Sequence, residues 1–283
     1  MSAGLSAPPT PSAVQQDPVA ELWQGRRQCR LVGSPEGLDA AGHSALGETL
    51  LRAAAGDGVD RIRVYHPPRT AAFSGLDRLS PGYVRAQEIA VEHGFAPLRR
   101  GPGGRMAAYH PDSLCIDIVL AEGPTSPTLD PWVGLGALAE VLATLLRGCG
   151  IDARAGQVEG EYCPGRFSVN VGGLVKLAGT AARRIRGATL LSAVLVVDDM
   201  EPLRAVTTDV YAALDFPFVP ATLGGAARYA PGLSARFLGR EFLGLQADRI
   251  EVVKDDVRPP ASQTISDVPP TDRRRSSSAK ENS

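Results

Sequence analysis

Apolar and polar positions follow two periods along this chain, and the two periods predict helices in some segments and strands in others. Apolar residues at helical spacing predict helices over residues 38–55, 82–93, 132–149, 201–214 and 232–246. A glycine follows each of the first three segments, as is typical of a helix C-terminus. Short apolar runs predict strands over residues 62–65, 114–120, 167–171, 175–178, 189–197 and 250–254.

This order of elements predicts the fold class. Clustered strands with helices interspersed irregularly are typical of an α/β (α+β) fold, in which helices cover a mixed β-sheet. Residues 189–197 are almost wholly apolar and predict a central strand. We expect one folded domain over residues 19–256, with a disordered leader over residues 1–18 and a disordered tail over residues 257–283. The leader has almost no large apolar side chains, and the tail contains pairs of prolines followed by a run of three arginines and three serines.

Composition and charge exclude several classes of protein. The 283 residues include 30 Lys and Arg against 31 Asp and Glu, a net charge of −1, so no overall field favours nucleic acid or a membrane surface. The longest apolar runs are about half of the roughly 20 residues that a transmembrane helix needs. The first residues lack the basic and apolar regions of a secretory signal. We therefore expect a cytoplasmic protein without nucleic-acid or membrane partners.

The four cysteines differ in their sequence surroundings. Their wide spacing, without CxxC or a nearby histidine pair, argues against a disulfide framework and a structural metal site. Cys115 and Cys149 fit core positions, whereas Cys163 lies in a polar Cys-Pro-Gly turn and is the candidate nucleophile. Arg166 and Lys176 would supply the positive charge that favours a thiolate. Alternatively, Lys176 extends from a sheet edge into solvent.

Residues 98–110 form a second candidate segment, in which three arginines surround three glycines. Glycines let a backbone approach a ligand closely, and N–H groups beside guanidinium groups bind anions. The segment is therefore a candidate cradle for a carboxylate, a phosphate or an acyl-adenylate. The alternative is a tight turn whose arginines face solvent. The phosphate-binding pattern GxxxxGK[ST] is absent.

These segments occur in a recognisable order. Arg-Arg-x-x-Gly-Gly-Arg is followed after about 60 residues by Cys-Pro-Gly and then by Lys-x-Ala-Gly-x-Ala-x-Arg-Arg. Over roughly residues 60–200 this order resembles the lipoate-protein ligase and octanoyltransferase family (biotin/lipoate attachment catalytic domains). The Cys-Pro-Gly turn looks most like the cysteine-dependent octanoyl/lipoyl amidotransferases.

The resemblance implies a fold and a set of roles. It implies a biotin/lipoate-protein ligase-like catalytic domain over residues 19–256. It also implies that Cys163 carries the acyl group as a thioester and that Lys176 contacts the acyl carbonyl or an activated acyl phosphate. The implied substrate-binding residues are Arg99, Arg100, Gly103, Gly104, Arg105 and Gly179.

The chain departs from the family pattern at several positions. Pro102 stands where Ser or Thr is usual, Ala182 where Gln is usual, and Ser168 where Asp is frequent. The stretch before Lys176 is one residue longer than usual, which predicts a β-bulge or a register shift.

Three functions remain open at this stage. The first is a transferase, without a cofactor, that moves an octanoyl or lipoyl group through Cys163 to a lysine of a lipoyl-domain carrier protein. The second is an ATP-dependent lipoate-protein ligase, which would use ATP and magnesium and would bind phosphates through the arginines of residues 98–110. The third is a catalytically silent acyl- or carrier-binding protein. For the transferase, His110 is either a catalytic partner of Cys163 or, as we expect, a capping or surface histidine.

Overall fold

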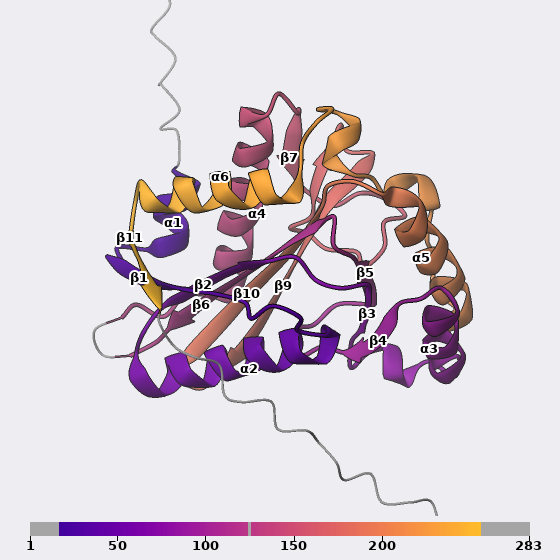
Figure 1. The fold of residues 1–283 in the computed structure, drawn as a ribbon, viewed down its shortest axis with the longest axis horizontal. Coiled ribbons are helices and arrows are strands. Elements are labelled where there is room, and N and C mark those ends of the chain that lie inside the picture. Colours follow the sequence, from indigo (N-terminus) through magenta and orange to yellow (C-terminus); the bar gives the residue numbers. More distant parts are fainter. Residues whose placement is uncertain (1–16, 124–125, 256–283) are drawn as a thin grey trace, which may run out of the picture.

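The computed structural model describes residues 17–123 and 126–255, which form an eight-stranded sheet and a three-stranded sheet with helices around them (Figure 1). The helices are α1 (Pro18–Trp23), α2 (Ala40–Asp57), α3 (Tyr83–Glu92), α4 (Pro131–Gly148), α5 (Met200–Leu214) and α6 (Ala235–Ala247), with 3-10 turns at η1 (Asp77–Leu79), η2 (Pro220–Thr222) and η3 (Ala226–Arg228). The strands are β1 (Gln28–Val32), β2 (Arg61–Tyr65), β3 (Thr70–Phe73), β4 (Ala96–Arg99), β5 (Ala107–Tyr109), β6 (Ser113–Ala121), β7 (Ala153–Ala155), β8 (Val169–Val171), β9 (Val175–Ile185), β10 (Ala188–Val196) and β11 (Glu251–Asp255).

The large sheet has the order β11-β1-β2-β6-β10-β9-β8-β7. β1 pairs in parallel with β2 and β11, whereas the pairs from β2 to β7 are antiparallel, so the sheet is mixed as predicted. β10 lies between β6 and β9, which confirms the predicted central strand. An apolar strand of this kind is stable in the centre because both of its faces are covered.

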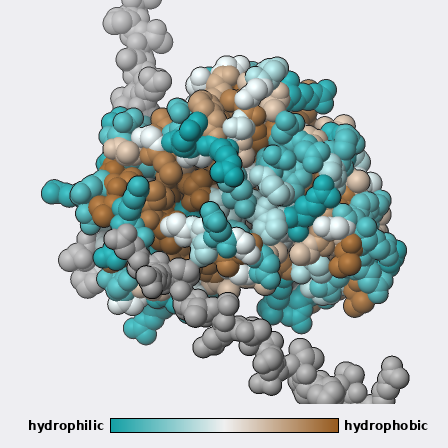
Figure 2. Space-filling view, in the orientation of Figure 1, coloured by the Kyte–Doolittle hydropathy of each residue, from teal (hydrophilic) through white to brown (hydrophobic). Residues whose placement is uncertain are grey.

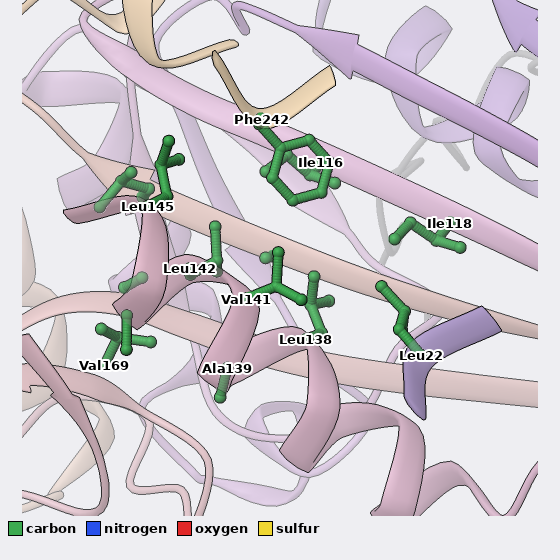
Figure 3. Close-up of a cluster of buried hydrophobic side chains, with 14 of the residues drawn as sticks. Leu22, Ile116, Ile118, Leu138, Ala139, Val141, Leu142, Leu145, Val169 and Phe242 are labelled. Carbon is green, nitrogen blue, oxygen red and sulfur yellow. The ribbon is translucent and has the colours of Figure 1, made fainter. Parts of the chain in front are cut away.

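Helices cover both faces of the large sheet. α2 lies along one face, and α1, α4 and α6 lie along the other (Figure 1). Asp130 caps the N-terminus of α4 by accepting from Trp132 N–H, and the helix then presents an apolar face to the strands. Leu138 and Leu142 of this helix are fully buried within the main core, which also contains Phe242 of α6 (Figure 3).

The small sheet, with the order β4-β3-β5, was not predicted. Its strands have three or four residues, too few to show a period of two. α3 and α5 pack against each other beside it, around a second apolar core that includes Phe73, Phe95 and Tyr211. The loop between β4 and β5 carries the Arg-Gly segment, so this sheet positions one half of the candidate site.

All the predicted helices and strands are present, with shifted ends. The largest shift is in β9, which continues to residue 185 because residues 178–185 pair with β10. α6 begins at residue 235, where Ser234 Oγ accepts from Phe237 N–H as its cap. The elements α1, β1 and β7, like the small sheet, are too short for the periodicity argument to find.

The ends of the chain are described only in part. α1 begins at Pro18, with Asp17 as its cap, so the folded part starts slightly before the predicted leader ends. The rest of that leader and the predicted tail lie outside the described residues. None of the helices in the described ranges combines the length and the hydropathy that crossing a membrane requires. On the face seen in Figure 2, apolar residues gather toward the edge where β1 and β11 lie, and hydrophilic residues dominate elsewhere.

Candidate active site

Cys163 lies in the loop between β7 and β8, in a turn whose backbone is unusual. Its φ is +41°, in the left-handed region that residues other than glycine rarely adopt. The Cys163 N–H donates to Tyr211 Oη at 2.6 Å, and the Tyr211 hydroxyl donates to Met106 O at 2.9 Å. A side chain of α5 therefore helps to hold the turn in this conformation.

The side chain of Lys176 also holds the Cys163 turn in place. Its Nζ donates to Tyr162 O at 2.9 Å and to Cys163 O at 3.0 Å, and it lies 3.5 Å from Glu161 Oε2. The side chain is buried at the start of β9, so the alternative that it extends from a sheet edge into solvent is wrong. Burial lowers the Lys176 pKa, and the negative groups of Cys163 and Glu161 oppose that shift.

Glu161 is a member of the site that the sequence analysis missed. Its buried Oε1 accepts from Gly165 N–H at 2.8 Å and from Ser168 Oγ at 3.0 Å. These bonds explain why serine suits position 168 here, because an aspartate would place a second carboxylate beside Glu161. Its position two residues before Cys163 could have indicated that Glu161 belongs to the site. No sequence feature indicated that Tyr211 does.

The Arg-Gly loop closes over the thiol from the other side. Arg105 N–H donates to Cys163 Sγ at 3.2 Å, and Arg100 Nη2 lies 3.4 Å from the same sulfur. Arg100 Nη2 also donates to Arg105 O at 2.6 Å, which fixes the loop against the guanidinium group. Gly104 has a φ of +99°, and a Cβ there would lie 2.7 Å from Cys163 Sγ. Glycine is therefore required for this close approach.

These contacts set the protonation of the thiol. Burial raises the Cys163 pKa, but the charges of Arg100 and Lys176 and the hydrogen bond from Arg105 N–H outweigh it, and the net shift is downward. The pKa values of the other three cysteines are raised, with burial as the main cause. Arg100 thus has the role predicted for Arg166, which is exposed, its guanidinium carbon 5.7 Å from the Phe167 ring centroid.

The lowered pKa makes a testable prediction about reactivity. A thiolate alkylates and a thiol does not, so Cys163 should react with iodoacetamide below the pH at which an ordinary thiol titrates, and its rate should fall only as the pH drops through its lowered pKa. In Arg100→Gln the charge that stabilises the thiolate is lost. We therefore expect the midpoint of the curve of alkylation rate against pH to rise by about one to two pH units. Peptide mass spectrometry of alkylation rate against pH measures both proteins. An unchanged midpoint would exclude Arg100 as a source of the shift.

The buried pair of Lys176 and Glu161 makes a second prediction. Lys176→Met would leave Glu161 without its counter-charge in the interior, and we expect the free energy of unfolding to fall by about 3–5 kcal/mol. Glu161→Gln should cost less, because its amide oxygen can still accept from Gly165 N–H. Urea unfolding followed by circular dichroism measures both. Equal stability of Lys176→Met and wild type would show that the pair does not support the turn.

A cavity of about 480 Å³ extends from Cys163 across the sheet face beneath α2. Gly103, Gly104 and Gly179 line it together with Cys163 and Lys176. Its apolar lining comes from the small sheet, α4 and the strands, with contributions from Leu98, Ala107, Trp132, Leu135, Leu190, Ala193 and Val194. Such a cavity has the size and the lining of a small-ligand site.

Two of the arginines predicted to bind the substrate, Arg99 and Arg105, are not part of the cavity lining. Arg99 is exposed at the end of β4, outside the cavity lining. The Arg105 guanidinium carbon stacks over the Phe216 ring at 3.8 Å from its centroid, so Arg105 serves the site through its backbone N–H. The sequence predicted both side chains in the cradle because a spacing does not reveal which way a loop residue points.

The other details of the motif follow the sequence analysis more closely. The pairing of β8 with β9 shifts register between Val169 and Asn170, which is the bulge predicted before Lys176. His110 is buried, so it is not a surface histidine, and its Nε2 lies 2.7 Å from the backbone oxygen of Asp199. The sulfur of Cys163 takes its hydrogen bonds from the Arg-Gly loop.

Comparison with solved structures defines the class of fold. The structure is similar to a bi-partite lipoate protein ligase from Thermoplasma acidophilum, with a TM-score of 0.58 and 17% identity over 81% of this chain and 87% of that chain. It is also similar to lipoate-protein ligase A bound with ATP, with a TM-score of 0.61 and 18% identity over 81% of this chain and 88% of that one. The fold is therefore that of lipoate-protein ligase catalytic domains, as the resemblance implied.

Sequence comparison gives more particular relatives. The chain is 27% identical over 169 residues to an octanoyl-[GcvH]:protein N-octanoyltransferase of Geobacillus kaustophilus, covering 59% of each. It is 29% identical over 170 residues to the protein of that name from Exiguobacterium sibiricum, covering 60% of each. The similarity thus spans about three fifths of the length of these curated relatives. No protein-family model matches the chain. These comparisons confirm the resemblance to lipoate-protein ligases and octanoyltransferases that was inferred from the motifs.

Proposed function

We propose that this protein transfers an octanoyl or lipoyl group from a donor carrier to a lysine of a lipoyl-domain protein, through a thioester on Cys163. The main observation behind the proposal is the environment of the Cys163 sulfur. Arg105 N–H and Arg100 favour its thiolate form and lower the Cys163 pKa, and Cys163 lines a largely apolar cavity. The similarity to octanoyl-[GcvH]:protein N-octanoyltransferases supports the same reaction.

The chemistry has two steps. The Cys163 thiolate adds to the acyl carbonyl, a C–S bond forms, and the bond to the donor's leaving atom breaks as that atom takes up a proton. The amine of the acceptor lysine then attacks the thioester, a C–N bond forms, the C–S bond breaks and the amine loses a proton. The cavity holds the acyl chain during both steps. The thiolate is restored at the end, so the reaction needs no nucleotide.

The charges around the cavity support a transferase more than a ligase. Among the arginines that line it, Arg63 and Arg184 form ion pairs with carboxylates, and Arg100 donates to Arg105 O and to Cys163 Sγ. Arg166 is exposed. A ligase would use cationic groups to bind the phosphates of ATP, and most of these guanidinium groups already have protein partners. The expected partners are lipoyl-domain carrier proteins, and a cytoplasmic location stays a prediction from the sequence.

The test follows acyl groups by intact mass spectrometry. The purified protein is mixed with octanoylated carrier domain and unmodified lipoyl domain, with and without ATP, and a parallel reaction supplies free octanoic or lipoic acid with ATP. We expect transfer without ATP, together with a transient acyl adduct on the enzyme. Modification only with free acid and ATP would establish the ligase. No transfer under any condition would leave an acyl- or carrier-binding protein.

A further inference from the structure

Arg105 contacts the protein in three directions. Its backbone N–H donates to Cys163 Sγ at 3.2 Å, and its backbone oxygen accepts from Arg100 Nη2 at 2.6 Å. Its guanidinium group reaches Asp77 of η1 and Phe216, which follows α5, and both are distant from Arg105 in the sequence. The proposed reaction uses the N–H and leaves the side chain without a role.

Asp77 is a buried carboxylate whose counter-charge is Arg105. Asp77 is fully buried, and its Oδ2 accepts from Ser74 N–H at 2.6 Å. Its Oδ1 has no hydrogen-bond partner among the described residues and lies 4.0 Å from Arg105 Nη1. This is the only ion pair of Asp77 within the part of the chain that the structure describes. Because a buried charge without a counter-charge is costly, the carboxylate favours the position in which the guanidinium group stays beside it.

Phe216 supports the guanidinium group on its flat side. The Arg105 guanidinium carbon lies 3.8 Å from the centroid of the Phe216 ring, which is the geometry of a cation–π contact. Phe216 packs against the second apolar core, and its ring lies edge-on to that of Tyr211, with centroids 6.3 Å apart. Tyr211 Oη accepts from Cys163 N–H. The Arg-Gly loop and the Cys163 turn are therefore both attached to the C-terminal end of α5.

The glycines before Arg105 explain why such support is needed. Gly101, Gly103 and Gly104 lie in the loop between β4 and β5. Glycine has more backbone freedom than any other residue, so a loop rich in glycine does not hold a fixed shape by itself. An N–H group stabilises an anion best when the fold holds the N–H in place before the charge forms. Contacts that fix the Arg105 side chain also limit the directions in which its N–H can point.

We propose that Asp77 and Phe216 are positioning residues, which hold the Arg105 side chain so that the Arg105 N–H stays directed at Cys163 Sγ. Neither residue lines the cavity, so each would act through Arg105. For its effect on acyl transfer the inference rests on the proposed function. Its effect on the thiol can be measured without any acyl transfer.

The experiment measures the rate of Cys163 alkylation by iodoacetamide against pH in the full-length protein. Asp77→Asn keeps an oxygen that can accept from Ser74 N–H and removes the charge that attracts Arg105. We expect the midpoint of the curve to rise by about half to one pH unit, the effect of weakening one hydrogen bond to the thiolate. The loss of a negative charge near the thiol would by itself lower the midpoint, so a rise reports displacement of the N–H.

Two further variants complete the comparison. Phe216→Leu keeps an apolar side chain but removes the ring beneath the guanidinium group, and it should raise the midpoint in the same direction. Arg78→Gln is the control, because Arg78 is the exposed neighbour of Asp77, and its midpoint should equal that of wild type. Circular dichroism confirms that each variant is folded. An unchanged or lowered midpoint in a folded Asp77→Asn or Phe216→Leu protein would overturn the role of that residue.

A double-mutant cycle tests whether Asp77 acts through Arg105. Arg105→Met alone should raise the midpoint, and adding Asp77→Asn to it should give no further rise. Equal rises with and without the Arg105 side chain would show that Asp77 acts on the thiol by another route and would overturn the proposal. An increase in KM for the carrier in Arg105→Met, with unchanged alkylation, would also overturn it, because the side chain would then bind the carrier. Absence of acyl transfer in the wild type would contradict the proposed function and would leave the alkylation results valid.

Discussion

Cys163→Ser is expected to lower the rate of acyl transfer by a factor of about 10⁴ or more and to abolish the acyl adduct. Removing a nucleophile from a coupled site commonly costs this much. A serine hydroxyl would accept the hydrogen bond from Arg105 N–H in place of the sulfur, but its proton is held far more tightly. The substitution therefore keeps the shape of the site and removes its reactive anion. Mass spectrometry of the enzyme and the acceptor domain measures both effects in one reaction.

Cys149→Ser is the matched control for this prediction. Cys149 lies at the end of α4 and its pKa is raised, mainly by burial, so its loss should leave transfer within about twofold of wild type. Full activity of Cys163→Ser with free acid and ATP would contradict the thioester route. The protein would then be a ligase in which Cys163 is structural.

The second large effect is expected at Gly104. An added Cβ would lie 2.7 Å from Cys163 Sγ and 2.8 Å from Arg100 Nη2, on a backbone whose φ of +99° is unfavourable for any other residue. The thiol or the guanidinium group must move, and either movement breaks the contact that lowers the Cys163 pKa. We expect Gly104→Ala to reduce kcat/KM by about 10²-fold or more, comparable to the loss of one oriented donor.

Gly103→Ala separates this steric effect from a general effect on the loop. No atom lies within 4 Å of a Cβ added at Gly103, so we expect less than a tenfold loss in that variant. The rate of Cys163 alkylation should fall in Gly104→Ala and stay close to wild type in Gly103→Ala. Similar activity and similar alkylation of the two alanine variants would show that Gly104 is not needed for the approach of the loop to the thiol.

The predicted site residues differ in how the structure uses them. Cys163, Lys176 and the glycines line one cavity, as the order of the motifs indicated. The Arg99 side chain lies outside the cavity lining, and Arg105 contributes its backbone. The order and spacing of the motifs indicated that the Arg-Gly segment, the Cys-Pro-Gly turn and the segment that begins at Lys176 form one site. It does not report side-chain direction in a loop, which depends on the backbone angles of the folded chain.

The sequence alone established the main strands and helices, the central position of residues 189–197, the suspect cysteine and the bulge before Lys176. Local period, turn chemistry and motif order carry that information, and each depends on residues close together in the chain. Tertiary structure decided the rest. Tyr211 reaches the Cys163 turn from 48 residues away, and Arg100 replaces Arg166 beside the thiol from 63 residues away. Likewise, Arg63, Asp117 and Ser192 meet in the cavity lining only because three neighbouring strands pair there. Contacts of this kind form when the chain packs, so no local pattern records them.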